Sequence, residues 1–358
     1  MKYFFILGRN PELSKLEIIS FFESRDIYSK QIIFDENLLV LDILIDSIDI
    51  KEFGGVIKLG KIIFEGNEKE FGGYLDKNEI IESDKFTYFV FGNIDFDLLK
   101  EKFKREKKKA MLKHGRKQIK FQDGEKINLS NAEFSLFLYG LKDKILLGIV
   151  DQDFYSSETE YRDMKKPIRR EALAISPRLS KILINLSGAK KEDLLIDPFC
   201  GVGGILQEAL LKGINVYGID KDLSVIKDAE ENLKWLKEKF EFKTKYTLDK
   251  NDSRRAPNLK FDAIATETPL GILLKKKPQD NEAKKIIFDF EEFIIPILAR
   301  LKKVKKDNAK IAIIFPVIRK FRVNVNKISK ESGLNIVYGP IEEFREDQYI
   351  SRDIVVFR

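Results

Sequence analysis

Apolar positions follow two different patterns along the first part of the chain, one typical of strands and one typical of a helix. Residues 2–8 (KYFFILG) and 37–45 (NLLVLDILI) have the apolar density of strands, whereas residues 11–24 (PELSKLEIISFFES) have helical spacing. Pro11 suits the first position of that helix. The pattern predicts a small α+β unit over residues 1–75.

A second unit is predicted over residues 76–152. It opens with the strand-like stretch 85–93 (KFTYFVFGN) and continues with a Lys-rich stretch at 101–120 that we interpret as a basic helix. Two further strand-like stretches follow, at residues 132–140 and 144–152.

A change in the pattern of apolar residues marks the start of a third unit. Residues 153–175 are polar and poorly periodic, and they predict a linker. Ser176 and Pro177 then suit the N-cap and first position of a helix. Strand-like and helix-like stretches alternate from there to residue 358. The expected strands lie within residues 193–197, 214–220, 245–249, 261–267, 309–317, 334–339 and 352–358.

This alternation is typical of βαβ units, so we expect an α/β domain over residues 176–358. Its sheet should have seven strands and be mainly parallel, with helices beginning at Gly204 and covering 222–238 and 281–301. We expect the last strand to be an antiparallel edge.

Composition places the chain among globular proteins of two or three domains, since it has 358 residues of which 43% are hydrophobic. One cysteine (Cys200) and one histidine (His114) exclude an internal disulfide or a zinc cluster, so we expect no metal. The sparse cysteine favours the reducing cytoplasm. No apolar run approaches the ~18 residues that span a bilayer, so we expect no membrane partner.

Charge is concentrated in one segment. Residues 101–120 hold ten Lys or Arg and two Glu, a local charge of +8, whereas the whole chain carries +7. Such a cluster favours a polyanionic partner, because neutralising phosphates supplies affinity without regard to sequence. A solvated lysine-rich helix is the alternative interpretation.

A glycine-rich turn at residues 197–204 (DPFCGVGG) indicates a nucleotide-like cofactor. It follows a strand that ends in Asp197, and Gly201 and Gly203 permit backbone paths that side chains would block. The next strand ends in Asp220, which is well placed to accept hydrogen bonds from ribose hydroxyls. The turn lacks the third glycine of the dinucleotide-binding fingerprint and the Gly-Lys-Ser/Thr ending of a P-loop. Cys200 has no nearby base, and we interpret it as a packing residue.

The stretch DPFCGVGGILQEALLKG resembles motif I of the class I S-adenosylmethionine-dependent methyltransferases. The resemblance implies that Asp197 lies near the methionine amino group and Asp220 holds the ribose of S-adenosylmethionine. Phe199, Gly201 and Gly203 would complete the cofactor turn. The same resemblance suggests Asp252 beside the adenine amino group, with Asp249 as the alternative.

The order of the parts resembles the THUMP-containing tRNA guanosine-N2 methyltransferases that act on position ten. The opening YFFILGRNPELSKLEI and the lead-in RREALAISPRLSKILINLSG also resemble that family. The resemblance implies a ferredoxin-like unit at residues 1–75 and a THUMP domain at 76–152, which together hold tRNA. Basic residues of the second unit are the candidate phosphate contacts: Lys107, Lys108, Lys109, Lys113, Arg116, Lys117 and Lys120. We interpret His114 as a surface or RNA-facing residue.

The stretch TETPLG (266–271) aligns with the family's Asp-Pro-Pro-Tyr motif. A carboxylate and a carbonyl there would accept the two N–H bonds of a guanine amine and direct its lone pair toward the methyl group. Glu267 keeps the carboxylate with one more methylene, and Pro269 keeps a rigid turn. Thr268 replaces a proline, and Leu270 replaces the aromatic ring on which a base would stack, worth ~1–3 kcal/mol.

The sequence is consistent with two functions. The favoured one is an active enzyme in which Glu267, Pro269 and Leu270 form the catalytic motif, with guanosine N2 as target and stacking supplied elsewhere, for example by Phe199. The alternative is a diverged relative or subunit that binds cofactor and tRNA without methyl transfer of its own. A methyltransferase of proteins or small molecules would leave the basic cluster without a role. We expect a monomer or weak homodimer.

Overall fold

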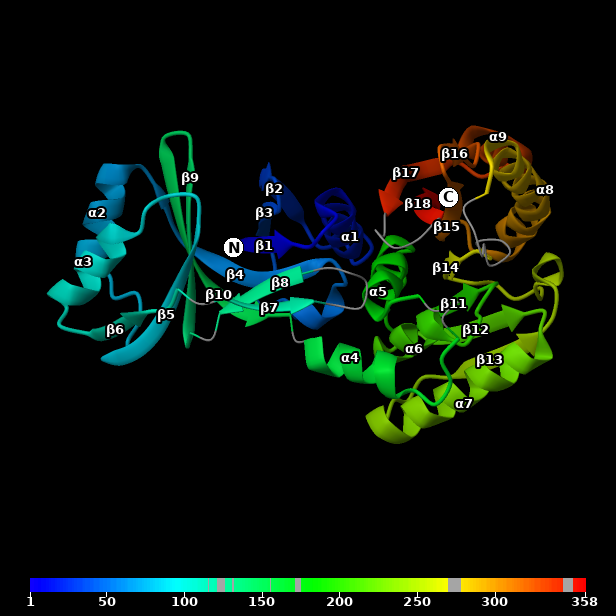
Figure 1. The fold of residues 1–358 in the computed structure, drawn as a ribbon, viewed down its shortest axis with the longest axis horizontal. Coiled ribbons are helices and arrows are strands. Elements are labelled where there is room, and N and C mark those ends of the chain that lie inside the picture. The colour runs from blue at the N-terminus through cyan, green and yellow to red at the C-terminus, as the bar shows by residue number, and fades with distance from the viewer. Residues whose placement is uncertain are drawn as a thin grey trace. The chain divides into compact units, whose positions relative to one another are not determined.

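The computed structural model describes residues 1–114, 116–120, 126–130, 132–154, 156–170, 175–269, 278–343 and 350–358. The chain folds into two compact units that do not follow the sequence in simple order (Figure 1). Unit 1 comprises Met1–Pro11, Tyr28–Ile50 and Val56–Phe154, and unit 2 comprises Glu12–Ile27, Lys51–Gly55 and Tyr155–Arg358. The chain therefore passes from one unit to the other five times.

Unit 1 is built on a mixed sheet of eight strands. Neighbouring strands are antiparallel except at one end, where β5 runs parallel to both β9 and β6. The order across the sheet is β2 (Ser29–Asp35), β3 (Leu38–Ile43), β1 (Lys2–Leu7), β4 (Val56–Gly66), β10 (Lys144–Asp153), β9 (Phe134–Leu141), β5 (Lys85–Gly92) and β6 (Lys109–Leu112). β7 (Arg116–Lys120) and β8 (Lys126–Ser130) form a separate antiparallel hairpin.

Two helices, α2 (Glu68–Lys77) and α3 (Asp97–Arg105), pack on this sheet through buried apolar residues that include Phe71 and Phe103. α2 begins with a capping box. The Asn67 side chain accepts a hydrogen bond from the Glu70 amide at 3.0 Å, and the Glu70 carboxylate accepts one from the Asn67 amide at 2.8 Å. A second apolar cluster contains Phe4 and Phe137, whose rings stack at 4.6 Å. The short elements of unit 1 are thus joined by two apolar layers.

The expected basic helix is shorter than the Lys-rich stretch that predicted it. α3 ends at Arg105, and Lys107 has a φ of 56°, which stops the helix. Lys109–Leu112 is instead a strand, with Lys109 and Met111 exposed while Ala110 and Leu112 pack against the core. This two-residue period was the sequence signal that the high lysine content obscured.

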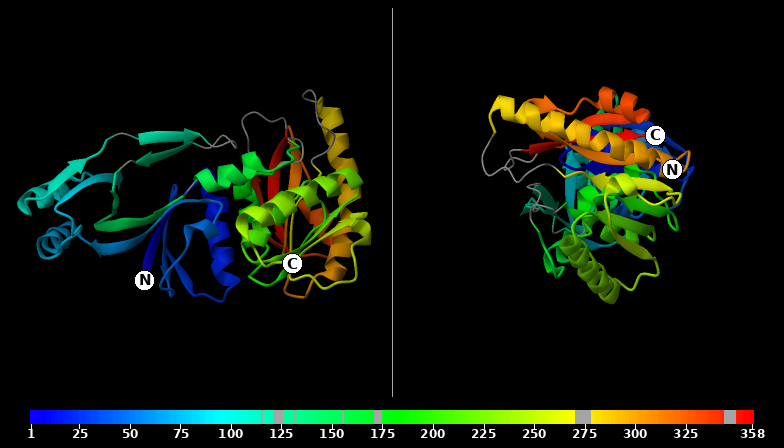
Figure 2. Two further views of the ribbon diagram at one scale, coloured as in Figure 1. Left: turned by 90° about the horizontal axis from the view of Figure 1, so that it is seen from below. Right: turned by 90° about the vertical axis from the view of Figure 1, so that its right-hand side faces the viewer.

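Unit 2 has a mixed sheet with helices on both faces, as Figure 2 shows. The strand order is β13 (Tyr246–Lys250), β12 (Asn215–Asp220), β11 (Leu194–Asp197), β14 (Ala263–Glu267), β15 (Ile311–Ile318), β18 (Ile350–Phe357) and β17 (Ile336–Glu343), with β16 (Phe321–Arg322) paired to β15. The first five strands in this order, β13, β12, β11, β14 and β15, are parallel to one another. β18 is antiparallel to both of its neighbours. The expected α/β fold is confirmed.

Each face of this sheet carries its own core. One includes residues of α5 (Pro177–Leu186), α6 (Gly204–Leu211) and α7 (Leu223–Phe240), and the other includes residues of α8 (Asp280–Val304) and α9 (Val325–Ser332). The last strand is antiparallel as expected, but it lies inside the sheet and β17 is the edge. The run of buried residues from Arg352 to Phe357 is typical of an interior strand.

The N-terminal helix α1 (Pro11–Glu23) belongs mainly to unit 2, because it is buried there by polar as well as apolar contacts. Leu13 joins the α5–α6 core, and the fully buried Glu17 accepts hydrogen bonds from the amides of Gly54 and Gly55 at 2.7 and 2.8 Å. Asn185 of α5 donates to the same carboxylate at 2.8 Å. Burial raises the pKa of Glu17, and these three donors oppose the shift.

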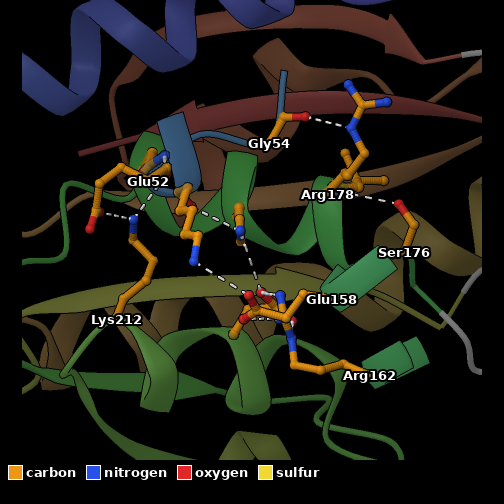
Figure 3. A network of polar contacts seen from close by, with 12 residues as sticks. Glu52, Gly54, Glu158, Arg162, Ser176, Arg178 and Lys212 are labelled. Carbon is orange, nitrogen blue, oxygen red and sulfur yellow. Dashed lines mark hydrogen bonds and ion pairs between the residues drawn. The ribbon is translucent and has the colours of Figure 1, made fainter. Parts of the chain in front are cut away.

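Residues 51–55 are held in unit 2 by cations from α5 and from the residue that ends α6 (Figure 3). The guanidinium of Arg178 donates to the Gly54 carbonyl at 2.7 Å, and the ammonium of Lys212 pairs with Glu52. Lys181 donates to the carbonyl of Lys51 at 2.8 Å. Residues far apart in sequence therefore form one polar network.

The polar stretch that predicted a linker contains helix α4 (Ser156–Lys165). Its Arg162 is buried and forms a two-point ion pair with Glu208 of α6, with N–O distances of 3.0 and 3.1 Å. Ser176 caps α5 as expected, since its side chain accepts from the Leu179 amide at 3.2 Å. In the part of the chain that the structure describes, no helix is long and apolar enough to cross a membrane.

Candidate active site

The glycine-rich turn joins β11 to α6 at the carboxyl edge of the unit 2 sheet. Gly201 and Gly203 have φ angles of 51° and 87°, and Gly203 is the N-cap of α6. These angles are strained for residues that carry a Cβ, which explains the glycines. A Cβ on Gly218 of the neighbouring strand would lie 2.6 Å from Leu206, so α6 packs closely on β12. The sequence-based prediction of a strand, tight turn and helix is confirmed.

Asp197 lies at the end of β11 with only 1% of its surface exposed. Its Oδ1 accepts a hydrogen bond from the Thr266 hydroxyl at 2.6 Å and another from the Phe199 amide at 3.1 Å. Burial raises the pKa of Asp197 to about 7 despite these donors, and the negative charges of Asp220 and Glu267 add to the shift. The site therefore contains a buried carboxyl group with two further carboxylates close enough to raise its pKa.

Asp220 lies at the end of the adjacent strand β12 and is half-buried. Its Oδ1 accepts from the Asp222 amide at 2.9 Å, which fixes the turn that opens α7. Because β11 and β12 are parallel neighbours, Asp197 and Asp220 end at the same edge of the sheet. Their roles at an amino group and a ribose stay predictions.

The two alternative acids for the third position are both already bonded. Asp252 caps a short 3-10 turn (Ser253–Arg255) and pairs with Arg254 at 2.5 Å, and this contact lowers the pKa of Asp252 to about 2. Asp249 accepts a hydrogen bond from the Tyr217 hydroxyl at 3.0 Å. Asp252 lies on the loop beyond the strand end, whereas Asp249 lies within β13.

Glu267 ends β14 and is largely buried, with 14% of its side chain exposed. Thr268 turns inward, where its hydroxyl donates to the Ile314 carbonyl at 2.7 Å, and Pro269 is exposed. Leu270 and Gly271 lie outside the described residues. Thr266 and Thr268 thus act as local hydrogen-bond donors that hold the end of this strand, a role that the sequence did not reveal.

Arg352 is the residue of this site that sequence reasoning missed. Its Nε donates to Oε1 of Glu267 at 2.6 Å from strand β18, 85 residues further along the chain. An Arg-Asp pair beside the apolar run IVVF was the available signal, because charged side chains are seldom buried without a partner.

Phe199 and Cys200 occupy the turn with different surroundings. Phe199 is half-buried, and its ring lies 6.0 Å from the ring of Phe293 on α8, centroid to centroid. Cys200 is buried, and burial raises the pKa of its thiol well above the usual value. A protonated, buried thiol suits the predicted packing role.

The candidate RNA contacts lie in unit 1, and those whose side chains the structure describes differ in exposure and ion pairing. Lys108 is engaged, since its ammonium pairs with Glu79 at 2.5 Å and also donates to the carbonyl of Ile81. Lys107 and Lys109 are exposed and Lys113 is half-buried. Arg116, Lys117 and Lys120 belong to β7.

Comparison with known proteins places this site in a family. Residues 165–321 match the model of the RMKL-like methyltransferase domain. The tRNA (guanine(10)-N2)-dimethyltransferase of Pyrococcus abyssi is 28% identical over 76% of this chain and 78% of its own length. The probable tRNA (guanine(10)-N2)-dimethyltransferase of Methanothermococcus thermolithotrophicus is 36% identical over 29% of this chain and 67% of that protein.

A structural relative agrees in fold. The crystal structure of TrmN from Thermus thermophilus superposes with a TM-score of 0.51 at 12% identity, covering 100% of this chain and 99% of that one. The α/β fold, the acidic residues at the strand ends and the glycine-rich turn beside them define a methyltransferase. The chain belongs to the family of tRNA guanine-N2 methyltransferases that the two sequence relatives represent.

Proposed function

We propose that this chain transfers a methyl group from S-adenosylmethionine to the exocyclic N2 amine of a guanosine in tRNA. The observation that carries the proposal is the gathering of Asp197, Asp220 and Glu267 at one edge of the sheet, beside a turn with two positive-φ glycines, in a chain of this family. In this proposal Asp197 and Asp220 bind the cofactor, and Glu267, at the end of a neighbouring strand, orients the amine.

The residues fit S-adenosylmethionine. Burial and two negative neighbours raise the pKa of Asp197, which disfavours its charged form. The positive charge of a nearby ammonium group would stabilise that charged carboxylate. Asp220 offers a half-buried carboxylate for ribose hydroxyls, and the Gly201–Gly203 turn allows close approach of the backbone. When bound, S-adenosylmethionine supplies an electrophilic methyl group on a sulfonium.

Glu267 is proposed to accept an N–H bond of the target amine. A carboxylate held at 14% exposure interacts more strongly with an N–H donor than one in water, and it directs the amine's lone pair away from itself. The carbonyl at Thr268–Pro269 is the proposed second acceptor. Leu270 keeps its proposed place in this motif without an aromatic ring, so Phe199 is the proposed stacking partner of the base.

Residues 1–152 are proposed to hold the tRNA, with a ferredoxin-like part at residues 1–75 and a THUMP domain at 76–152. Exposed Lys107 and Lys109, together with Lys113 and the basic strand β7, support phosphate contacts there. The ammonium of Lys108 is already paired, so its proposed contribution is mainly structural. We keep the expectation of a cytoplasmic monomer or weak homodimer.

The direct test uses tritiated S-adenosylmethionine with total tRNA transcribed without modifications, followed by nucleoside analysis. Label in N2-methylguanosine or N2,N2-dimethylguanosine is expected. Label in another nucleoside would contradict the assigned target. Binding of cofactor and tRNA without label in any nucleoside would favour the diverged, non-catalytic relative.

Asp220→Ala separates cofactor binding from RNA binding. The variant should bind S-adenosylhomocysteine at least about tenfold more weakly, because each lost hydrogen bond to a charged group costs about 1.5–3 kcal/mol. Its affinity for tRNA should be unchanged. An equal loss of both affinities would contradict the division of tasks between the units.

A further inference from the structure

Among the described residues, Arg352 is the charged partner that fixes the Glu267 carboxylate. Arg352 Nε lies 2.6 Å from Oε1, and the two side chains are 5% and 14% exposed. Among the described residues no other donor is within hydrogen-bonding distance of this carboxylate. The contact is a charge-assisted hydrogen bond in a mostly dry setting, which is the stronger kind.

The register of the sheet explains how strand β18 reaches β14 across β15. Glu267 pairs with Ile314 of β15, and Ile314 pairs with Ile354 of β18. Arg352 is two residues from Ile354, so it points to the same face and lies one step closer to the edge where the site is. The insertion of β18 inside the sheet is what brings the guanidinium to the site.

The pairing also bears on the extra methylene of Glu267. A glutamate has one more rotatable bond than the aspartate of the related motif, and that freedom would spread the carboxylate over several positions. Holding Oε1 on Arg352 removes this freedom and leaves Oε2 to accept an N–H bond. We infer that Arg352 is the positioning residue of this methyltransferase site, orienting Glu267 toward the target amine. This inference rests on the function proposed above.

Kinetics of four variants test the inference: Arg352→Ala, Arg352→Lys, Glu267→Gln and the Arg352→Ala/Glu267→Gln double variant. Arg352→Ala should lower kcat by about 10²-fold, the scale of a misplaced catalytic group, with little change in KM for tRNA. Lys should restore part of kcat, because it supplies one charged donor. In the Glu267→Gln background Arg352→Ala should cause little further loss. Independent, multiplying losses would overturn the inference.

Arg322→Ala is the matched control. Arg322 also projects from this sheet and binds carboxylates, Asp353 at 2.5 Å and Glu342, but it does not contact Glu267. Its loss should lower thermal stability without coupling to Glu267→Gln. Coupling as large as that of Arg352 would mean that general sheet stability is being measured.

A crystal structure of Arg352→Ala gives a readout that does not depend on activity. The Glu267 side chain should occupy more than one rotamer or turn toward solvent, whereas it should stay single in Arg322→Ala. An unchanged Glu267 in Arg352→Ala would overturn the inference even in an active enzyme. If the wild type labels no tRNA nucleoside, the proposed function fails, and this structure still decides whether Arg352 positions Glu267.

Discussion

Asp197 combines deep burial with a cluster of negative neighbours. Its pKa is raised to about 7, mainly because burial penalises the charged form. The folded protein therefore holds this group largely protonated in mild acid, where an unfolded chain would ionise it near pH 4.

This shift gives a pH-dependent prediction for stability. The contribution of a raised carboxyl pKa is fully present below the unfolded pKa and is lost as pH rises through about 7. Ionisation of the buried Asp197 should lower the free energy of unfolding by roughly 4 kcal/mol above pH 7 in the absence of ligand. Asp197→Asn, which can still accept from Thr266 and Phe199, should remove that cost. Urea titrations from pH 4 to 8 should show the two proteins diverging toward alkaline pH, and parallel curves would contradict the assignment.

Ligand binding should have the opposite pH trend at this residue. A cationic amino group beside Asp197 favours its ionised form, so affinity for S-adenosylhomocysteine should rise from pH 5.5 to 7. Calorimetry over that range is the measurement, and Asp197→Asn should give weaker and flatter binding. An equally steep profile in the Asn variant would assign the titration to another group.

Glu267→Ala tests the amine acceptor alone. Removing one hydrogen-bonding group at a reacting centre costs about 10²–10³ in kcat. Cofactor affinity should stay close to that of the wild type, since Asp197 and Asp220 are intact. Unchanged methyl transfer in single-turnover assays would exclude Glu267 from the chemistry.

At the scale of elements, the start of α6 depends on backbone geometry. Gly203→Ala must place a Cβ at a φ of 87°, which costs about 1–2 kcal/mol and displaces the turn before the helix. We expect a lower midpoint of thermal unfolding and weaker binding of S-adenosylhomocysteine.

Gly73→Ala is the matched control, because Gly73 lies within α2 and nothing stands within 4 Å of the added Cβ. This change should stabilise by about 0.5–1 kcal/mol and leave cofactor binding alone. A loss of stability in Gly73→Ala as large as in Gly203→Ala would show that the backbone angle is not the cause.

Strand β6 and the turn before it should contribute to tRNA affinity through the charges of Lys107 and Lys109. A Lys107→Gln/Lys109→Gln variant removes two exposed cations and should weaken tRNA binding while reducing the slope of log K against log salt by about 1–2. Filter binding at several salt concentrations measures both. Lys100→Gln/Lys104→Gln, two exposed cations of α3, is the comparison, and an equal loss there would mean that overall charge and not position matters.

Local features of the site were predictable from sequence, and long-range ones were not. Ser176 capping α5 and the turn from Asp197 to Gly203 follow from neighbouring residues alone. The Arg352 contact joins strands 85 residues apart and depends on where β18 enters the sheet. The sequence predicts a helix at Lys109–Leu112, where the structure has a strand, because the high lysine content hides the two-residue period of exposed and buried side chains.

At the scale of the whole molecule, the sequential division into domains is still a prediction, and the compact units divide the chain differently. α1 and residues 51–55 fold with the segment that begins at residue 155. Glu17, Glu52 and the Gly54 carbonyl satisfy buried groups on α5 and α6, including Asn185, Arg178 and Lys212. Buried polar groups without partners cost about 1–3 kcal/mol each.

A fragment of residues 156–358 should therefore be unstable. It loses the partners of Asn185, Arg178 and Lys212 together with the apolar contact of Leu13. Circular dichroism should show a lower and less cooperative unfolding transition than the full chain. An equal transition midpoint would mean that α1 contributes nothing to this unit.

The five passages of the chain between units also limit how such a protein can change during evolution. A single genetic exchange at residue 155 would separate α1 from the surface it covers, and the recipient would inherit an incomplete catalytic half. Exchange of either half between relatives would have to keep both sides of the α1 contact matched. The two halves should therefore share one line of descent, and phylogenies built separately from each should have the same branching order.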